Sequence, residues 1–176
     1  MPQTVLAFLA MMIVTMLSLN QQQSMLLAYE LMLNDEMEFM ASAVALRSIE
    51  YISQREFDNA VSGTATVSNP SELQDLPFVQ GNDCLLQGLD LNCLDVDDYH
   101  SMTVDTMSFS GRDDTFAFAV SAEVFYVDDT VNPDSSVTYE TYSKLIAVEA
   151  QDLIGIMLKP IRITRLVVCE PADGCL

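Results

Sequence analysis

The sequence contains one histidine, His100, which directly follows the residues Asp97-Asp98-Tyr99. An Asp and a His at close spacing can carry out acid–base chemistry. The sequence contains no G-x-S-x-G, P-loop or H-E-x-x-H pattern that would assign a reaction to such a pair. We therefore interpret His100 as a solvated or hydrogen-bonding structural side chain, and we expect no catalytic residue and no enzymatic activity.

Several carboxylates lie close to His100 in the sequence. Carboxylate oxygens are the ligands that Ca²⁺ prefers, so a structural calcium ion is one explanation for them. No spacing among them matches an EF-hand loop, and an acidic, solvated loop is the alternative. We expect no cofactor and no metal site, with structural Ca²⁺ kept as the alternative. The side chains concerned are Asp83, Asp90, Asp95, Asp97 and Asp98.

The four cysteines form two close pairs. Eight residues separate Cys84 from Cys93, and five separate Cys169 from Cys175. Neither pair has the C-x-x-C spacing of a zinc or redox site, and a single histidine does not complete a zinc ligand set. Two local disulfides within these pairs are the simplest interpretation, and they would indicate an oxidising compartment. Three connectivities are possible, and four buried free thiols are the alternative.

The charge balance excludes one class of partner. The chain carries 26 acidic and 7 basic residues, a net charge of -19. Phosphate contacts need Lys and Arg, so we expect no nucleic-acid partner. The same field opposes docking on an anionic membrane surface and keeps a protein soluble, including in salty environments. We interpret the acidity as a matter of habitat or solubility.

A long N-terminal helix is predicted over residues 1–57, because no proline follows Pro2 before Pro70 and the first glycine is Gly63. Residues 1–24 carry no charged side chain and form an expected apolar assembly or membrane segment. Within it, Val5–Leu19 is apolar on nearly every face and must be buried in lipid or in protein, and Gln21–Gln23 mark a polar step. Residues 25–57 alternate apolar and charged side chains at helical spacing. This second half is expected to pack on the head.

The rest of the chain is predicted to hold a connecting region and a β-rich head. Residues 58–100 are expected to be loop-rich, stapled by a disulfide, with one short helix near residues 71–75 that Ser71 would cap. Residues 101–176 are expected to form an antiparallel sheet of about four strands, which gives an α+β fold. The alternation predicts strands at 101–109, 115–129, 137–150 and 161–169, with a turn over 128–136 and a short helix or wide loop over 152–159.

This layout resembles the type IV pilin and pseudopilin superfamily. Members have an apolar N-terminal helix that continues into an amphipathic half packed on an antiparallel sheet, and a disulfide-closed loop near the carboxyl terminus. The resemblance is one of architecture, because the Glu at the fifth mature position of most pilins is replaced by Val5. The absence of a basic leader fits a chain that is already processed to Met1. The residues that carry the resemblance are Met1–Leu19, the continuation to Ile52, the strands from Thr103 to Val168, and Cys169–Cys175.

The resemblance implies a structural subunit of an extracellular, cell-surface filament. Its partners would be identical copies arranged as a helical polymer, and the chain would insert transiently into the inner membrane before assembly. The apolar helices would bundle and the heads would form the outer surface. The implied assembly residues are Val5, Leu6, Phe8, Leu9, Met12, Ile13, Met16 and Leu17.

Two other functions stay open. The segment Val5–Leu19 with its flanks approaches the roughly 20 residues that span a bilayer, so the chain could be a single-pass anchor for a periplasmic or cell-surface domain, such as a minor pseudopilin or binding module. Without Lys or Arg at its flanks, the orientation of such an anchor is unspecified. A secreted binding module or enzyme would need a polar pocket around His100.

Overall fold

The computed structural model shows an α+β protein, as predicted, in which one long helix precedes a five-stranded antiparallel sheet. The chain forms two compact units, Met1–Met37 and Glu38–Leu176. Helix α1 (Pro2–Ser53) supplies the described residues of the first unit and continues into the second. The structure describes residues 2–61, 67, 69–74, 84, 86, 93–102, 105–110, 115–128, 130 and 132–169.

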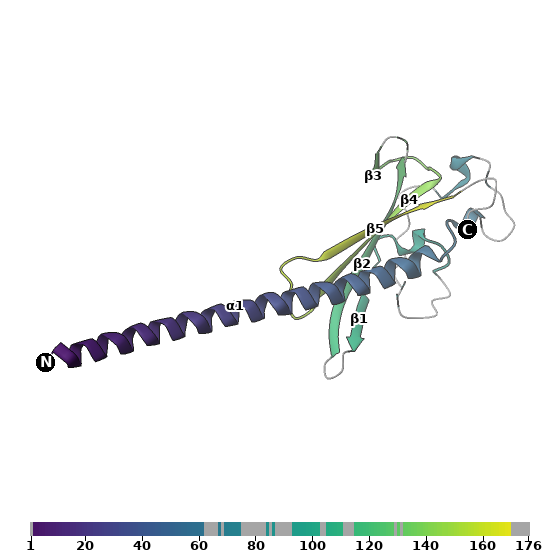
Figure 1. Ribbon diagram of the computed structural model, residues 1–176. Coiled ribbons are helices and arrows are strands. Elements are labelled where there is room, and N and C mark those ends of the chain that lie inside the picture. Colours follow the sequence, from purple (N-terminus) through teal and green to yellow (C-terminus); the bar gives the residue numbers. More distant parts are fainter. Residues whose placement is uncertain are drawn as a thin grey trace. The chain divides into compact units, whose positions relative to one another are not determined.

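Helix α1 covers 52 residues without a break (Figure 1). Its length follows from the absence of glycine and of any proline after Pro2, which sits in the first turn, where a helix needs no N–H donor. The helix ends at Ser53, earlier than the predicted residue 57. Beyond it, Glu56 pairs with Asp95 in a parallel β-bridge and accepts a hydrogen bond from the N–H of Val96 (3.0 Å), so the chain is already extended there.

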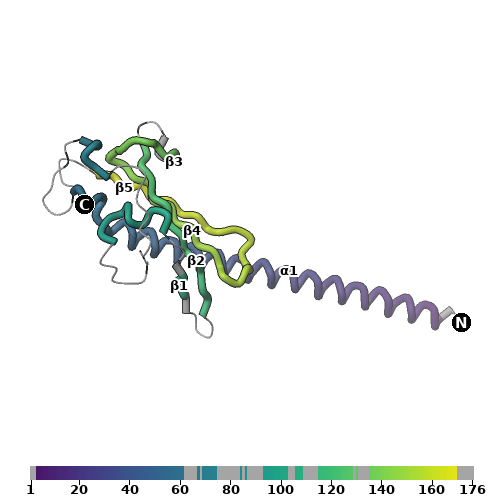
Figure 2. The backbone as a smooth tube through the Cα atoms, turned by 180° about the vertical axis from the view of Figure 1, so that it is seen from behind, coloured from purple at the N-terminus to yellow at the C-terminus, as the bar shows by residue number. Residues whose placement is uncertain are grey.

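The second unit contains the sheet. All its pairings are antiparallel in the order β1-β2-β4-β5, and β3 pairs with the end of β2 (Figures 1 and 2). Strand β4 pairs with β2 on one side and with β5 on the other, in the two longest ladders of the sheet, and it is the most buried strand. The strands are β1 (Asp105–Ser110), β2 (Thr115–Asp128), β3 (Asn132–Ser136), β4 (Ser143–Asp152) and β5 (Ile161–Val168).

One face of the sheet forms the core. Alternate side chains of β2 from Phe118 to Tyr126 are buried, as the period-two pattern predicted, and Val124 lies opposite Ile146 of β4. The part of α1 within this unit buries one side, at Ala41, Ala45, Ile49 and Ile52 among others. It meets β1 through the Ser48 hydroxyl, which donates to the sulfur of Met107 (3.1 Å). The predicted packing of helix on sheet is therefore confirmed for residues 38–53.

Two strand predictions were wrong around residue 137. A turn was predicted over 128–136, but residues 132–136 form β3 and pair with β2 across an irregularity at Val127 and Asp128. Strand β4 begins at Ser143, not at Val137. The hydroxyl of Thr141 donates to the carbonyls of Val127 and Ser143 (2.8 Å each), and this local bonding precedes the ladder of β4.

The structure also differs from the short helix predicted near residues 71–75 and decides between the two predictions for residues 152–159. Near residue 71 a 3₁₀ turn spans Pro70–Glu72, and it begins after Asn69 with no side-chain cap, so Ser71 is not the capping residue. No helix forms over residues 152–159. The carboxylate of Asp152 instead accepts the N–H groups of Ile156 (2.6 Å) and Met157 (3.1 Å) and closes a wide loop. This outcome agrees with the wide loop that was the other prediction for the segment.

We expect Ile146→Ala to lower the free energy of unfolding of the head by about 2 to 5 kcal/mol, because its fully buried side chain would leave a cavity. The matched control is Ile154→Ala, whose side chain is 64% exposed and should change stability by no more than about 0.5 kcal/mol. Denaturant unfolding of the full chain in detergent, followed by near-ultraviolet circular dichroism of the tyrosines, measures both. Equal losses in the two variants would contradict the assigned core.

Candidate functional site

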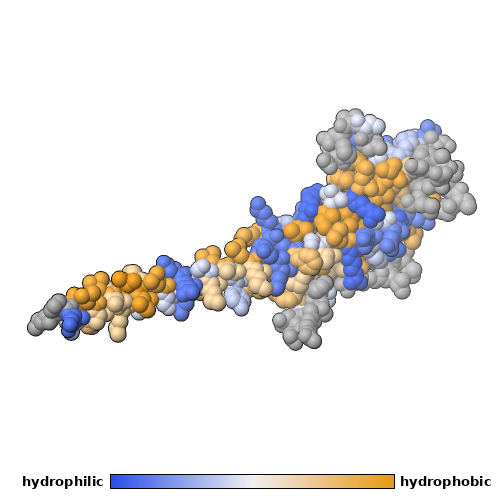
Figure 3. Space-filling model, in the orientation of Figure 1, coloured by the Kyte–Doolittle hydropathy of each residue, from blue (hydrophilic) through white to orange (hydrophobic). Residues whose placement is uncertain are grey.

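The first candidate site is the apolar part of α1. All side chains from Gln3 to Leu33 are exposed, and the first charged one is Glu30. Apolar residues cover most of the visible surface near the start of the helix (Figure 3). The predicted assembly side chains are all solvent-exposed, from 54% for Ile13 to 78% for Phe8; the others are Val5, Leu6, Leu9, Met12, Met16 and Leu17.

The length of this segment suits an apolar environment. At about 1.5 Å per residue, the uncharged stretch from Gln3 to Tyr29 is roughly 40 Å long, more than the roughly 30 Å hydrocarbon core of a bilayer. Among the described residues, α1 is the one helix long and apolar enough to cross a membrane, and none of its apolar window is buried within the chain. A helix exposed on every apolar face is stable only when lipid or protein covers it.

The hydroxyl of Thr15 does not interrupt this apolar surface. Thr15 Oγ1 donates back to the carbonyls of Met11 (3.0 Å) and Met12 (2.9 Å) within the same helix. Its hydrogen-bonding capacity is therefore met without a partner from another chain. The central part of the segment can be placed in an apolar environment without leaving this hydroxyl unsatisfied.

The second candidate site lies in the head and consists of Asp58, Asp95, Asp97 and Lys144, which we call the Lys144 cluster. All four residues are buried, and the side chain of Lys144 is fully so. The ammonium nitrogen, Nζ, lies 2.5 Å from Asp97 Oδ2 and 3.2 Å from Asp58 Oδ2. One carboxylate oxygen from each of the three aspartates lies within 4.8 Å of the others.

Three separate parts of the chain position the cluster. Asp58 follows the end of α1, Asp95 and Asp97 come from the turn around the 3₁₀ helix Asp97–Tyr99, and Lys144 is the second residue of β4. The β-bridge between Glu56 and Asp95 brings the first two parts together. Because Lys144 is in register with Ile146 and Val148, it points to the core face of the sheet.

Aromatic rings and a carbonyl complete the surroundings of the ammonium group. Lys144 Nζ lies 4.3 Å from the ring centre of Phe57 and 4.9 Å from that of Tyr126, both cation–π distances. It also donates to the carbonyl oxygen of Phe57 (2.8 Å). The hydroxyl of Tyr126 donates to Asp58 Oδ2 (3.4 Å) and to the carbonyl of Gln74 (3.2 Å). The cluster is therefore enclosed by aromatic side chains.

The three carboxyl groups differ in their proton affinity. Burial acts to raise the pKa of Asp58, but Lys144 and the N–H groups of Gln74 and Ala60 more than offset it, so this pKa is lowered. Burial, followed by the charge of Asp98, raises the pKa of Asp95 to about 6. Burial raises the pKa of Asp97 to about 7, although Lys144 opposes the rise. The ammonium group of Lys144 thus balances the charge of the ionised Asp58 carboxylate. The raised pKa values of Asp95 and Asp97 mean that these two carboxyl groups bind protons more readily than an ordinary aspartate.

The structure describes three of the five aspartates that were considered as alternative calcium ligands. Asp95 and Asp97 do gather with a third carboxylate, but the cation between Asp97 and Asp58 is the ammonium of Lys144. Asp98 lies beside them and accepts the N–H groups of Leu94 (2.8 Å) and Asp95 (3.3 Å). Asp83 and Asp90, the other two residues considered for the alternative calcium site, lie outside the described residues.

His100 has a structural role. Its Nδ1 atom lies 2.5 Å from the carbonyl oxygen of Val124 and 3.3 Å from the backbone nitrogen of the same residue. The ring is thereby fixed against the middle of β2. This contact agrees with the interpretation of His100 as a hydrogen-bonding structural group.

Sequence reasoning missed Lys144 and Asp58. The usable signal was the position of Lys144 in the period-two pattern of the third predicted strand (137–150), where it falls on the apolar face with Ile146 and Val148. A lone lysine on a core face requires buried partners of opposite charge. Those partners lie 86 and 47 residues away along the chain, so local spacing could not identify them.

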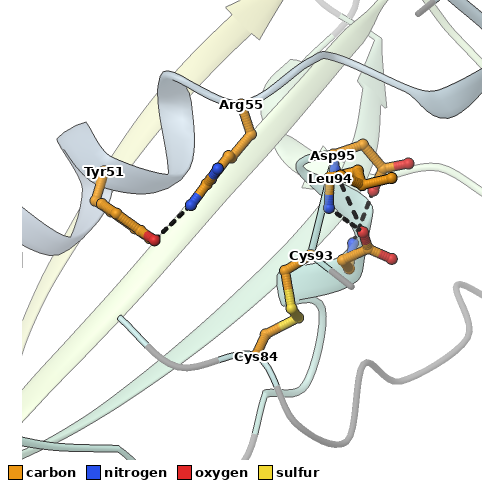
Figure 4. Close-up of a disulfide and its surroundings, with 7 residues drawn as sticks. Tyr51, Arg55, Cys84, Cys93, Leu94 and Asp95 are labelled. Atoms are coloured by element: carbon orange, nitrogen blue, oxygen red, sulfur yellow. Dashed lines mark hydrogen bonds between the residues drawn. A yellow bond between two sulfur atoms is a disulfide. The ribbon is translucent and has the colours of Figure 1, made fainter. Parts of the chain in front are cut away.

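A disulfide holds the turn that carries Asp95 and Asp97. Cys84 and Cys93 are bonded, with their Cα atoms 5.7 Å apart, as predicted, and both are buried. Figure 4 shows the bond directly before Leu94 and Asp95. Cys169 is also disulfide-bonded. Its predicted partner, Cys175, lies outside the described residues.

Tyr51 lies in the last turn of α1 and Arg55 just beyond it, and their side chains point toward one another (Figure 4). The guanidinium of Arg55 donates to the hydroxyl of Tyr51 and lies 4.7 Å from the centre of its ring. The ring of Tyr51 in turn meets that of Tyr99 edge to face, with centres 6.3 Å apart. These contacts fix the last turn of α1 on the 3₁₀ helix that carries Asp97.

We expect the head to lose stability as pH rises from about 4 to about 7. The raised pKa of Asp95 means that the folded state holds its proton more tightly than the unfolded state, so the stabilisation is full below the unfolded pKa and is lost as pH passes about 6. The loss from this group is on the order of 3 kcal/mol.

The matched variant is Asp95→Asn, which cannot titrate. Denaturant unfolding at pH 5 and pH 7.5 should show a smaller pH-dependent loss in the variant, because repulsion among the other acidic groups is common to both proteins. Identical losses in the two proteins would exclude Asp95 as a source of the pH dependence.

A comparison of the sequence with family models, curated proteins and solved structures finds no match.

Proposed function

We propose that this chain is a structural, non-enzymatic subunit of an extracellular pilus-like filament, similar in design to type IV pilins. Copies of the chain would polymerise through their N-terminal helices. The observation that carries the proposal is the uncharged segment of α1 in which every side chain from Gln3 to Tyr29 is exposed, on the same chain as a separately folded acidic unit. The long helix packed on an antiparallel sheet is compatible with a pilin-like architecture.

A bundle of neighbouring helices would cover the apolar segment completely. A single partner surface covers one side of a helix, whereas Val5 to Leu19 is apolar on nearly all sides. Several copies packed around each other leave no apolar side in water. The segment also includes Met11, Met12 and Met16, whose flexible side chains adapt to irregular contacts between neighbours.

The absence of charge favours packing between copies. A carboxylate buried between apolar helices destabilises the bundle unless it meets a partner. No acidic or basic side chain precedes Glu30, so packing of this segment buries no charged side chain. The stagger of neighbouring helices would then be set by shape and by contacts between heads.

The distribution of charge separates the two roles along the chain. All 26 acidic and all 7 basic residues lie at Glu30 or later. An acidic head stays hydrated and repels other heads, which would leave the apolar helices as the main attraction between subunits. Salt screens such repulsion within a Debye length, so filament formation would be favoured by higher ionic strength.

The second candidate function is a single-pass membrane anchor for a cell-surface domain. The observation that favours it is the length and composition of α1, which are sufficient to cross a bilayer. A filament subunit that enters the membrane before assembly needs the same segment. The two functions therefore differ in where the helix finally resides.

We expect material sheared from cells that produce the chain to contain filaments built from it, visible by electron microscopy. Mild detergent should leave these filaments intact, because their helices are covered by protein. Release of the chain as a detergent-solubilised monomer, with no filaments in the sheared fraction, would favour the membrane anchor and overturn the filament proposal.

A pair of variants tests the segment itself. Ile13→Lys places a charge in the middle of the apolar segment, where its burial costs several kcal/mol, and should abolish filaments. Gln22→Lys adds the same charge at an already polar, exposed position and should leave filaments present. Filaments of normal abundance in Ile13→Lys would show that this segment is not their core.

A further inference from the structure

The Lys144 cluster places an amine against a carboxyl group in a site closed to solvent. The Nζ atom of Lys144 lies 2.5 Å from Asp97 Oδ2, closer than the roughly 2.7–2.9 Å of an ordinary charge-assisted hydrogen bond. The side chains of Lys144 and Asp97 have no exposed area. We propose that Lys144 and Asp97 condense to form an intramolecular isopeptide bond between Nζ and Cγ.

Burial disfavours the charged form of Asp97 in particular. The ammonium group of Lys144 has three hydrogen-bond acceptors and lies against the rings of Phe57 and Tyr126, whereas the carboxylate it pairs with is incompletely hydrogen-bonded. Asp97 Oδ1 is buried and has no hydrogen-bond partner in the described part of the chain. Proton transfer from Lys144 to Asp97 removes both charges and leaves a neutral amine, the nucleophilic form of lysine, beside a carboxylic acid.

The geometry selects Asp97 over Asp58 as the carboxyl group that reacts. Asp58 accepts N–H groups from Ala60 (2.8 Å) and Gln74 (2.9 Å), and these bonds hold it as a carboxylate, which is a poor electrophile. Within the described ranges of the chain, Asp97 receives no such backbone N–H bond, and its raised pKa agrees with a carboxylic acid. Asp97 is therefore the better acceptor for attack by the amine.

The remaining two carboxyl groups can move the protons. The neutral amine of Lys144 attacks Cγ of Asp97, and the nitrogen then loses a proton to Asp58 Oδ2, which lies 3.2 Å from Nζ. Asp95 also accepts backbone N–H groups, from Asn59 and Asp98 (3.0 Å each), but burial and the charge of Asp98 outweigh these bonds and raise its pKa to about 6. In its protonated form Asp95, whose carboxyl group lies within the same 4.8 Å cluster, gives a proton to the departing hydroxyl group, which leaves as water. A proton passed from Asp58 to Asp95 restores both groups. The balance is one ammonium and one carboxylate converted into one amide and one water, without oxidant or reductant.

The bond would tie the central strand of the sheet to the disulfide-held turn. It would close a covalent loop from residue 97 to residue 144, which contains β1, β2 and β3. A cross-link of this kind restricts the unfolded chain and so raises stability. The inference concerns the head alone and does not depend on the proposed filament.

Intact mass spectrometry of the purified full chain, denatured and with disulfides reduced, tests the proposal. The expected mass is lower than that of the sequence by one water molecule. A proteolytic digest should contain one branched peptide that joins residue 97 to residue 144. The full sequence mass in the wild-type protein, or a branched peptide that carries residue 58 in place of 97, would overturn the proposal.

The two lysines of the chain, Lys144 and Lys159, provide a matched pair of variants. Lys144→Arg removes the reacting amine and should show no loss of water, whereas Lys159→Arg changes an exposed lysine and should retain it. Asp95→Asn removes the proton donor and should leave most of the chain unreacted. Loss of water that persists in Lys144→Arg would show that it arises elsewhere and overturn the proposal; complete reaction of Asp95→Asn would overturn the role of Asp95. The wild-type mass and digest decide the main proposal even if a variant does not fold.

Discussion

The ammonium group of Lys144 connects the three parts of the head that the sequence keeps far apart. It donates to the carbonyl of Phe57, which follows α1, and to the carboxylates of Asp58 and Asp97, while its own backbone belongs to the inner strand β4. The path of the chain after α1 and the placement of the turn around Asp97 both depend on these contacts. Removing the ammonium alone would leave two buried carboxyl groups without their cation, which is more costly than never having buried them.

The regular elements were predictable because their signals are local. A stretch without glycine or internal proline predicted α1, and the alternation from Phe118 to Tyr126 predicted the buried face of β2. The start of β4 was not predictable in the same way, since the residues from Val137 also alternate and only the hydrogen bonds of Thr141 separate them from the strand. Periodicity describes which side chains share a face, but it does not show which backbone groups find a partner.

The two candidate sites also differ in how far local sequence signals could predict them. The apolar segment of α1 was readable because its composition alone requires cover. The Lys144 cluster was predicted only in part, because its members Asp58 and Lys144 were missed. The acidic residues near Asp97 were noticed for their charge, and a metal ion was considered as their cation, whereas the actual cation is a lysine 47 residues further along the chain. Contacts at such separation follow from the tertiary fold and have no counterpart in local spacing.

The internal hydrogen bonds of Thr15 have a consequence for how the helix changes its surroundings. The Thr15 hydroxyl is bonded within the helix, so the middle of the segment needs no polar partner for it in lipid or in a bundle of like helices. The free energy of moving the segment between these two apolar phases then depends mainly on dispersion contacts and on subunit concentration. If copies of the chain polymerise as proposed, partition between bilayer and polymer would be an equilibrium that mass action can shift, and growth or disassembly would require no change in the hydrogen bonds of Thr15.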